Sequence, residues 1–299
     1  MIKSRITLKQ LEAFAFVVDL GTFRAAAVAL GTTQPNISSR IATLEAALDT
    51  KLLYRDAGSV RLTAKGAALL DKSRAVLRAT EEMLEEAGRQ DLIEERLRLG
   101  VTELIACTWL QEFLRRLKQK YPALRVELLV DLSRAVDERL SEGQIDLALQ
   151  NGPFDTDLEG QRELAREEYV WVANREMAAS LPDTRDVARF FNFSVLTHAR
   201  HTTAGQSLHE MASQRGYNTQ KIVHSSALSA CIPMVSEGLG VALLPRSLVQ
   251  RDIRSGSLVV LKADWHAEPL RFFARYDPSR APRFVERAAG IAEQLRPLL

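Results

Sequence analysis

A short run of amide, hydroxyl and guanidinium side chains carries the clearest chemistry in this sequence. The amide of Gln34 can bond the edge of an adenine at two points, and an arginine can bond guanine or a phosphate. Pro35 offers apolar surface to a thymine methyl group. The complete run is Thr33, Gln34, Pro35, Asn36, Ser38, Ser39 and Arg40. Displayed on one face of a helix, these side chains predict contacts with the base edges and phosphates of double-stranded DNA.

The flanking residues are expected to hold this run at the start of the third of three helices. Apolar residues recur at helical spacing over 8–18, and Gly21 ends that helix. A second helix is expected over 23–30, with Thr22 as its cap. Gly31 ends the second helix, and Pro35 then fits the first turn of the next one behind a threonine cap. This order predicts a helix-turn-helix.

Two short extended segments around Gly58 predict a β-hairpin directly after the helices, in the position of a wing. Arg55 and Arg61 flank this hairpin and are expected to contact phosphates. Residues 1–65 hold nine Lys and Arg against five Asp and Glu, whereas the remainder holds 31 against 33. The basic excess therefore lies on the segment that is predicted to bind DNA.

The residues from Thr63 to about Gln90 predict one long helix, about 27 residues or ~40 Å in length. Leu70, Leu77 and Leu84 repeat every seven residues along it. A long helix with such an apolar seam favours pairing with its own copy. The alternative is burial of the seam against the rest of the same chain.

The second part of the chain alternates strands with helices, after an acidic segment, Asp91–Glu95, that reads as a hinge. The first set is expected as strand 96–101, helix 105–121, strand 124–132, helix 134–144 and strand 145–149. The second set is expected as strand 194–197, helix 204–215, strand 221–223, helix 227–237 and strand 241–244. Strands joined by helices predict parallel sheets, and two such sets predict two lobes with a cleft between them.

Polar residues follow several of these strands, where loops and helix N-termini meet. They are Thr102, Ser133, Gln150, Asn151, Thr202, Thr203, Ser225 and Ser226. Such hydroxyls and amides favour a small polar or anionic ligand in the cleft, although each can equally be an ordinary helix cap. A second group in the same loops could neutralise a carboxylate: His198, Arg200, His201 and His224.

Composition and missing motifs exclude several other classes of protein. No apolar run approaches the ~18 residues of a membrane span, and the N-terminal residues do not read as a secretory signal, so a cytoplasmic protein is expected. Motifs typical of hydrolases, metalloproteases, nucleotide-binding loops and dinucleotide-binding folds are missing, so neither an enzyme nor a cofactor or metal site is expected. The adjacent Glu167 and Glu168 are expected to face solvent. Cys107 and Cys231, far apart in helical segments, are expected to be buried and to serve packing.

The chain resembles the LysR-type transcriptional regulators over essentially its whole length. The N-terminal residues that carry the resemblance are Leu8-x-x-Leu11-x-x-Phe14, Gly21-Thr-Phe23-x-x-Ala26-Ala27-x-x-Leu30, Thr33-Gln-Pro35-x-Ile-Ser38, Leu44-Glu45, Leu52-Leu53-x-Arg55 and Leu62-Thr63-x-x-Gly66. The C-terminal ones are Gly143-Gln-Ile-Asp-Leu-Ala-Leu149 and Gly238-Leu-Gly-Val-Ala-Leu-Leu-Pro245. Any one of these motifs is moderately specific, and their order together is highly specific.

The resemblance implies an N-terminal winged helix-turn-helix, a long linker helix, and an α/β two-lobed effector domain similar to periplasmic binding proteins. We expect a DNA-binding domain over 1–63, a linker and dimerisation helix over 64–90, and an effector-binding domain over 91–299. Lobe I is expected over about 96–165 and 266–299, and lobe II over about 166–265. Thr102 and Ser133 match positions where the family often holds its effectors, and Arg55 matches its phosphate-contacting arginine. A homodimer that pairs into a homotetramer is also implied.

The sequence departs from the family pattern at one position that bears on base recognition. The position after the motif serine is often arginine in the family, whereas here it is Ser39 and the arginine follows as Arg40. One residue along a helix rotates a side chain by ~100°, so Arg40 is not expected to replace that arginine. Two alternatives stay open: a small-molecule binding protein with vestigial DNA binding, and a nucleoid protein that binds DNA without sequence preference.

Overall fold

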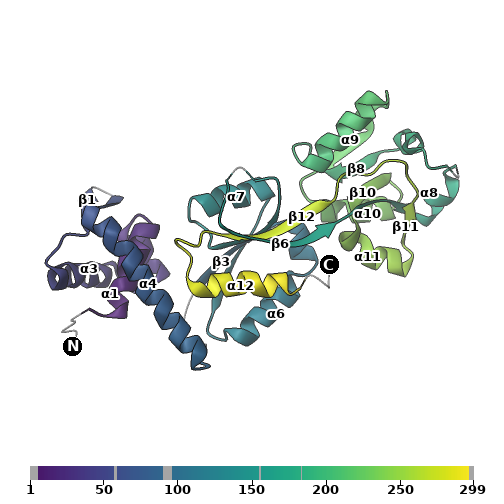
Figure 1. Cartoon of the computed structure of the whole chain (residues 1–299). Coiled ribbons are helices and arrows are strands. Elements are labelled where there is room, and N and C mark those ends of the chain that lie inside the picture. Colours follow the sequence, from purple (N-terminus) through teal and green to yellow (C-terminus); the bar gives the residue numbers. More distant parts are fainter. Residues whose placement is uncertain (1–5, 57–58, 90–95, 155, 183, 296–299) are drawn as a thin grey trace.

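The computed structural model describes residues 6–56, 59–89, 96–154, 156–182 and 184–295 (Figure 1). A winged helix, a first lobe and a second lobe lie in a row, and one long helix lies between the winged helix and the first lobe. The winged helix contains α1 (Leu8–Asp19), α2 (Phe23–Ala29), α3 (Gln34–Leu48), β1 (Leu53–Asp56) and β2 (Ser59–Leu62). The expected helix-turn-helix with a β-hairpin behind it is confirmed.

The first three helices form because their apolar residues meet in one small core. Phe14 of α1 and Ile37, Ile41 and Leu44 of α3 are completely buried there. Thr22 caps α2 as expected, since its side chain accepts a hydrogen bond from the backbone of Ala25 at 3.0 Å. The core thereby fixes which face of α3 is left outside.

The wing is attached to this core by polar contacts of motif residues. The carboxylate of Glu45, itself buried, accepts bonds from the backbone N–H groups of Leu52 at 2.8 Å and Leu53 at 3.3 Å. The backbone N–H of Val60 donates to the carbonyl of Gly21 at 3.1 Å. These bonds hold the hairpin beside the turn between α1 and α2.

The long helix α4 (Ala64–Glu86) is shorter than expected, because Gly88 adopts a left-handed conformation (φ 67°) that ends it. Leu70 is buried in the winged-helix core, Leu77 packs at the edge of that core, and Leu84 packs against the core of the first lobe. Leu70 is therefore covered within the same chain, whereas Leu77 and Leu84 are only partly covered, and pairing of two chains along this face of α4 stays a prediction. A heptad repeat identifies one helix face, and it does not identify what covers that face.

Helix α4 is also bonded to the first lobe. Helix α12 (Arg283–Glu293) begins against it, and the backbone N–H of Arg283 donates to the Glu81 carboxylate at 2.7 Å. The Arg283 side chain pairs with Glu82, and Arg78 donates to the carbonyl of Pro278 at 3.1 Å. The linker helix is therefore attached to both the DNA-binding and the effector-binding parts.

The C-terminal part contains two five-stranded sheets, as the two-lobed fold requires. The first, in spatial order, is β4 (Arg125–Val130), β3 (Arg96–Val101), β5 (Leu147–Asn151), β12 (Leu270–Tyr276) and β6 (Gly160–Glu167). The second is β11 (Leu258–Leu261), β7 (Tyr169–Asn174), β10 (Val241–Pro245), β8 (Val195–His198) and β9 (Ile222–Ser225). The chain passes from the first sheet to the second between β6 and β7, and it returns as β12.

Helices cover both sheets and create their cores. Those around the first sheet are α5 (Glu103–Cys107), α6 (Leu110–Lys120), α7 (Ser133–Ser141) and α12. Those around the second are α8 (Arg175–Ser180), α9 (Thr203–Gln214), α10 (Cys231–Ser236), α11 (Arg246–Ser255) and the short 3-10 helices η2 (Val187–Asn192), η3 (Thr219–Lys221) and η4 (Leu228–Ala230). The central strands β5 and β10 are buried on both faces, which explains their nearly continuous apolar sequences.

Several expected element boundaries are wrong. The single helix expected over 105–121 is two, α5 and α6, separated at Thr108 and Trp109. The helix expected over 227–237 begins as the 3-10 turn η4 and continues as α10. The helix expected over 134–144 is α7, which ends before Gly143, whose φ is 70°. Strands β6, β7, β11 and β12 and helices α8, α11 and α12 were not anticipated. The expected hinge over 91–95 and residues 57–58 of the hairpin lie outside the described residues.

Candidate nucleic-acid interface and interlobe cleft

The residues expected to meet DNA come together on the outer face of α3. Ile37 and Ile41 point into the core and leave the intervening side chains outside. Of the expected set, five are exposed and Ser38 and Arg40 are half-buried; the exposed ones are Thr33, Gln34, Pro35, Asn36 and Ser39. The cap is weaker than expected: Thr33 makes no capping bond, and the Thr32 hydroxyl accepts a hydrogen bond from the side-chain amide of Asn36 at 3.1 Å. A polar surface of this kind can enter a DNA groove.

The structure separates Ser39 from Arg40. Arg40 lies near Glu12 of α1, where burial raises the pKa of the Glu12 carboxyl and the arginine acts to lower it. Ser39 is exposed, and its carbonyl accepts a bond from the Thr43 hydroxyl at 2.7 Å. Gln10 of α1 donates to the same hydroxyl at 3.0 Å. Arg40 therefore lies toward α1 and does not occupy the place of Ser39.

The wing brings its two arginines to opposite strands. Arg55 lies in β1 opposite Val60, and its side chain is outside the described part. Arg61 is exposed on β2 opposite Tyr54. Tyr54 is 57% exposed and was not singled out from the sequence, because an aromatic residue in a short strand usually reads as core.

In the first lobe, Thr102 and Gln150 carry polar atoms that are buried without a hydrogen-bond partner among the described residues. Thr102 follows β3, and its hydroxyl oxygen is one such atom. Gln150 is the penultimate residue of β5 and is completely buried; its amide nitrogen donates to Asp137 at 3.2 Å and its Oε1 is unpartnered. Buried polar atoms are nearly always satisfied, so these two indicate a place where a ligand can bond.

A buried ion pair orients Gln150. The guanidinium of Arg275 on β12, 0% exposed, pairs with Asp137 of α7 and also bonds Gln161 at 3.0 Å. It lies 3.8 Å from the ring centroid of Phe154. Because Asp137 accepts from both Arg275 and Gln150, the amide of Gln150 is held in one orientation.

Other expected cleft residues are engaged locally. The Ser133 hydroxyl donates to the Asn151 carbonyl, and the Asn151 amide donates to that of Gly152 at 3.2 Å. Thr202 is a helix cap, accepting from Gly205 at 3.2 Å and donating to Ala199 at 2.7 Å.

The remaining hydroxyls lie in the second lobe. Ser225 bonds within its own turn, its hydroxyl donating to the Ala227 carbonyl at 2.6 Å. Thr203 and Ser226 are exposed. Thr202 is therefore an ordinary helix cap and Ser225 an ordinary turn residue, and neither hydroxyl is held ready for a ligand.

The histidines beside the cleft are not the positive cluster that the sequence favoured. Burial lowers the pKa of His198 to about 4, so its ring is neutral near pH 7. His224 Nδ1 lies 2.9 Å from the carbonyl of His198 and must donate to it, so in the neutral ring Nε2 is an acceptor without a partner among the described residues. Arg200 and His201 are exposed.

The residue that joins the two lobes at this place was missed by sequence reasoning. One Glu103 oxygen accepts from the backbone N–H of Leu228 at 2.6 Å. The other accepts from the backbone N–H of Ser229 at 3.2 Å and from its hydroxyl at 2.6 Å. The only signal in the sequence was that Glu103 directly follows Thr102, which was itself expected to contact an effector.

Two further expectations are corrected. Cys107 is exposed, because α5 is short and turns this position outward, whereas Cys231 is buried as expected. Burial and the nearby Glu103 raise the pKa of the Cys107 thiol, and burial raises the pKa of Cys231 to about 11. Glu167 does not face solvent: it is buried and accepts from the backbone of Ser247 at 2.7 Å, whereas Glu168 is exposed.

Exposed apolar residues mark two surfaces outside the cleft. On α4, Val76 and Met83 are 48% and 63% exposed and seven residues apart. On the first lobe, the edge strand β4 exposes Val126, Leu128 and Val130.

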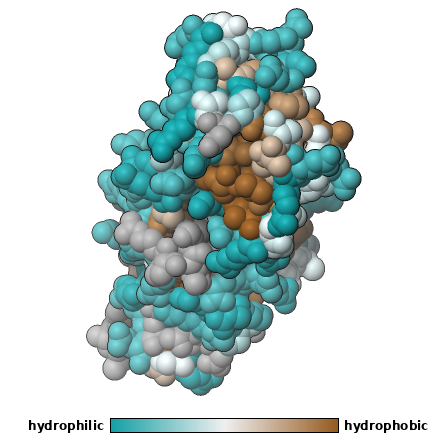
Figure 2. Space-filling view, turned by 90° about the vertical axis from the view of Figure 1, so that its right-hand side faces the viewer, coloured by the Kyte–Doolittle hydropathy of each residue, from teal (hydrophilic) through white to brown (hydrophobic). Residues whose placement is uncertain are grey.

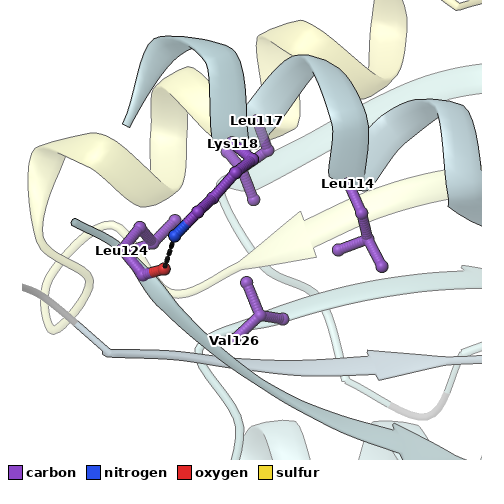
Figure 3. A pocket seen from close by; sticks show the side chains of 5 residues that line it. All are labelled: Leu114, Leu117, Lys118, Leu124 and Val126. Atoms are coloured by element: carbon purple, nitrogen blue, oxygen red, sulfur yellow. Dashed lines mark hydrogen bonds between the residues drawn. The ribbon is translucent and has the colours of Figure 1, made fainter. Parts of the chain in front are cut away.

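Beside this strand lies a groove of about 300 Å³, lined by Leu114, Leu117, Lys118, Leu124 and Val126 (Figure 3). Figure 2 shows apolar residues gathered in one region of an otherwise hydrophilic face. Contiguous apolar surface of this kind marks interaction sites.

Neither a metal centre nor a membrane-spanning helix is found within the described ranges. Groups of three or more His, Cys, Asp or Glu able to hold a metal ion are missing from those residues. The described helices are too short or too polar to cross a bilayer.

Comparison with known proteins covers both parts of the chain. A model described as the LysR substrate binding domain matches residues 90–293, and one described as a bacterial regulatory helix-turn-helix protein of the lysR family matches residues 8–67. A probable hydrogen peroxide-inducible genes activator of Streptomyces viridosporus is 30% identical, over 98% of this chain and 95% of that protein. The transcriptional regulator GltR of Bacillus subtilis is 26% identical, over 85% of this chain and 84% of that protein.

Solved structures share the fold. A full-length variant of OxyR from Pseudomonas aeruginosa has a TM-score of 0.58 at 20% identity, covering 97% of this chain and 95% of its own. Full-length BenM has a TM-score of 0.56 at 21% identity, covering 97% of both chains.

Proposed function

The chain belongs to the LysR family of transcriptional regulators, and from this premise we propose how it reads DNA and what controls it. It binds specific sites in double-stranded DNA through α3 and the wing. A small polar metabolite, held between the two lobes, controls this binding or the activation that follows. A protein that acts on the chromosome does so in the cytoplasm, where we place it.

The observation that carries the DNA-binding proposal is the exposed polar start of α3 above a completely buried face. Gln34 is aimed outward and reads a base edge, and Pro35 and Asn36 lie beside it. Arg55 and Arg61 contact phosphates and set the position of the wing. Since Arg40 lies toward Glu12, Ser39 takes part in base or phosphate contacts in its place.

The proposal is tested by footprinting the full-length protein on DNA fragments selected from a random pool. A sequence-specific regulator protects isolated, related sites. Protection of every fragment alike would instead support a nucleoid protein without sequence preference. Failure to bind any DNA would support the alternative of a metabolite-binding protein with vestigial DNA binding.

Control by a metabolite is favoured over control by oxidation of a thiol, although one relative is named for induction by hydrogen peroxide. Reactive cysteines have lowered pKa values, because the thiolate is the nucleophile. Here the pKa values of Cys107 and Cys231 are both raised. Mass spectrometry after peroxide treatment should find both thiols intact; oxidation of either one together with altered DNA binding would reverse this preference.

The two exposed apolar surfaces support a homodimer that pairs into a homotetramer. Val76 and Met83, next to the partly buried Leu77 and Leu84, form the exposed part of the seam through which two copies of α4 pair. Leu128 and its neighbours on β4 then join dimers. In sedimentation of the full chain, Met83→Lys should abolish the dimer and Leu128→Lys should leave dimers that no longer form tetramers. Unchanged masses in both variants would remove this assignment.

The attachment of α4 to the first lobe supports a route from effector to DNA. Arg283 and Arg78 link the end of lobe I to the linker helix. A change in lobe arrangement therefore alters the direction of α4 and with it the placement of paired DNA-binding domains. Such control requires the effector to bind two arrangements with different affinity.

A further inference from the structure

We propose that Glu103 is an internal carboxylate clasp between the lobes, and that it leaves a cleft suited to an effector bearing hydrogen-bond donors. The clasp is a property of the chain alone. The ligand class rests on the proposed function, namely that the cleft binds an effector.

The clasp is built from three hydrogen bonds to one side chain. Glu103 belongs to α5, directly after β3 of the first lobe, whereas Leu228 and Ser229 belong to η4 of the second. Two backbone N–H groups and one hydroxyl converge on the carboxylate at 2.6–3.2 Å. Hydrogen bonds to an ionised acceptor are about twice as strong as neutral ones. The lobes are therefore joined before any effector arrives.

This arrangement changes the expected chemistry of the ligand. The N–H groups and hydroxyl that a carboxylate ligand would use at this place are already occupied by Glu103. An anion entering here would have to displace the Glu103 carboxylate or lie beside its negative charge. Of the two ligand classes expected from the sequence, polar or anionic, the anionic one is therefore not supported at this end of the cleft.

Unpartnered buried atoms at the carboxyl ends of β3, β5 and β9 point to donors on the ligand. Gln150 uses its amide nitrogen on Asp137, so the free atom is the accepting Oε1. His224 uses Nδ1 on a carbonyl, so its free Nε2 also accepts. The Thr102 hydroxyl can donate or accept. With the Glu103 charge, these atoms favour an ammonium or hydroxyl-bearing molecule over a carboxylate.

The clasp is tested by chemical rescue in the full-length protein. Glu103→Ala removes the carboxylate and leaves its three donors unbonded, so the melting temperature should fall by several degrees. Acetate, titrated against chloride at constant ionic strength, should fill the gap and restore much of this loss in a saturable manner. Wild type should respond to acetate no more than to chloride.

Glu112→Ala is the matched control, since Glu112 accepts bonds from Arg115 and Arg116 of its own helix. It should show neither the loss nor the rescue. A Glu103→Ala variant that melts like wild type, or that acetate does not restore, would overturn the clasp. Should that variant not fold, Glu103→Gln keeps the shape and must show faster amide exchange at Leu228 and Ser229; unchanged exchange would overturn the clasp equally.

The ligand class is tested with two small probes of similar size, ethanolammonium and propionate. Wild type should be stabilised more by ethanolammonium, and Glu103→Ala should reverse this order. Equal responses in wild type, or a larger one to propionate, would overturn the donor-bearing class. These measurements need no DNA, so their failure leaves the DNA-binding proposal intact, and a failure of footprinting leaves the clasp intact.

Discussion

The outer face of α3 and the cleft between the lobes differ in how their polar side chains are used. On α3, most of the predicted residues are exposed and project from one continuous helix. In the cleft, Ser133, Thr202 and Ser225 are bonded within the protein. Thr102 and Gln150 keep a free buried atom each. A DNA-binding surface needs polar side chains exposed on a helix. A ligand-binding cleft needs polar atoms that the protein itself leaves without hydrogen-bond partners.

The largest effect on stability is expected from a variant that breaks the buried ion pair that orients Gln150 and leaves the DNA-binding face unchanged. Arg275→Met leaves Asp137 buried without its cation, and removing one partner of such a pair typically costs about 3–5 kcal/mol. Urea unfolding should show this loss in the effector-binding part. The exposed pair of Arg271 and Glu163 provides the control, and Arg271→Met should leave the unfolding curve close to that of wild type. Equal losses in both variants would contradict a structural role for the buried pair.

The second-largest effect is expected from a variant that removes a DNA contact on α3 and leaves the effector-binding part unchanged. Gln34→Ala should weaken binding to the selected site by roughly 1–3 kcal/mol, because one two-point base contact is lost. Its unfolding curve should match wild type, since Gln34 is exposed. Exposed Gln220→Ala of the second lobe is the control in gel-shift titrations. Unaltered affinity in Gln34→Ala would place base recognition elsewhere.

A third prediction concerns pH and separates the two regions further, since the second lobe holds a partly buried histidine, His198. His198 has a pKa of about 4 in the folded chain against 6.5 for an ordinary histidine. As the pH falls, the imidazole of His198 is therefore protonated in the unfolded chain before it is protonated in the folded chain. The stability that His198 contributes is complete above pH 6.5 and is lost as the pH falls toward 4.

Given its partial burial, this loss should amount to roughly 1–2 kcal/mol. Urea unfolding followed by tryptophan fluorescence measures it across this pH range, in a variant with Trp109 of the first lobe replaced by Phe so that Trp171 and Trp265 report on lobe II. His198→Asn should flatten the dependence, and exposed His266→Gln should not. A slope that survives in His198→Asn would assign the titration to another group.

The smallest effect is expected from a variant of the wing that loses one phosphate contact. Arg55→Ala should weaken binding to selected and unrelated DNA alike, and lower the slope of affinity against salt by about 1, because a single phosphate contact is lost. Gel-shift titrations at several salt concentrations measure this slope. A loss confined to the selected sequence would show that Arg55 reads a base.

Local patterns predicted the winged helix well, because its helices are short, capped and amphipathic within a few turns. Thr22, Gly31 and Ile37 each act on neighbours close in sequence. The same reasoning misassigned Leu70, since periodicity cannot distinguish burial in the same chain from burial in a copy. It also missed the break between α5 and α6, where Trp109 packs inward and continuous helix propensity is overridden by the core.

The order of the parts, the polar face of α3 and the family could all be read from the chain alone, because each depends on spacing along a few turns or strands. Which polar atoms are free for ligands became known only from the folded arrangement. Gln150 is oriented by Arg275, and Glu103 meets Ser229, across separations of more than a hundred residues. Hydrogen bonds depend on distances in space, and residues that distant along the chain meet only once both lobes have folded.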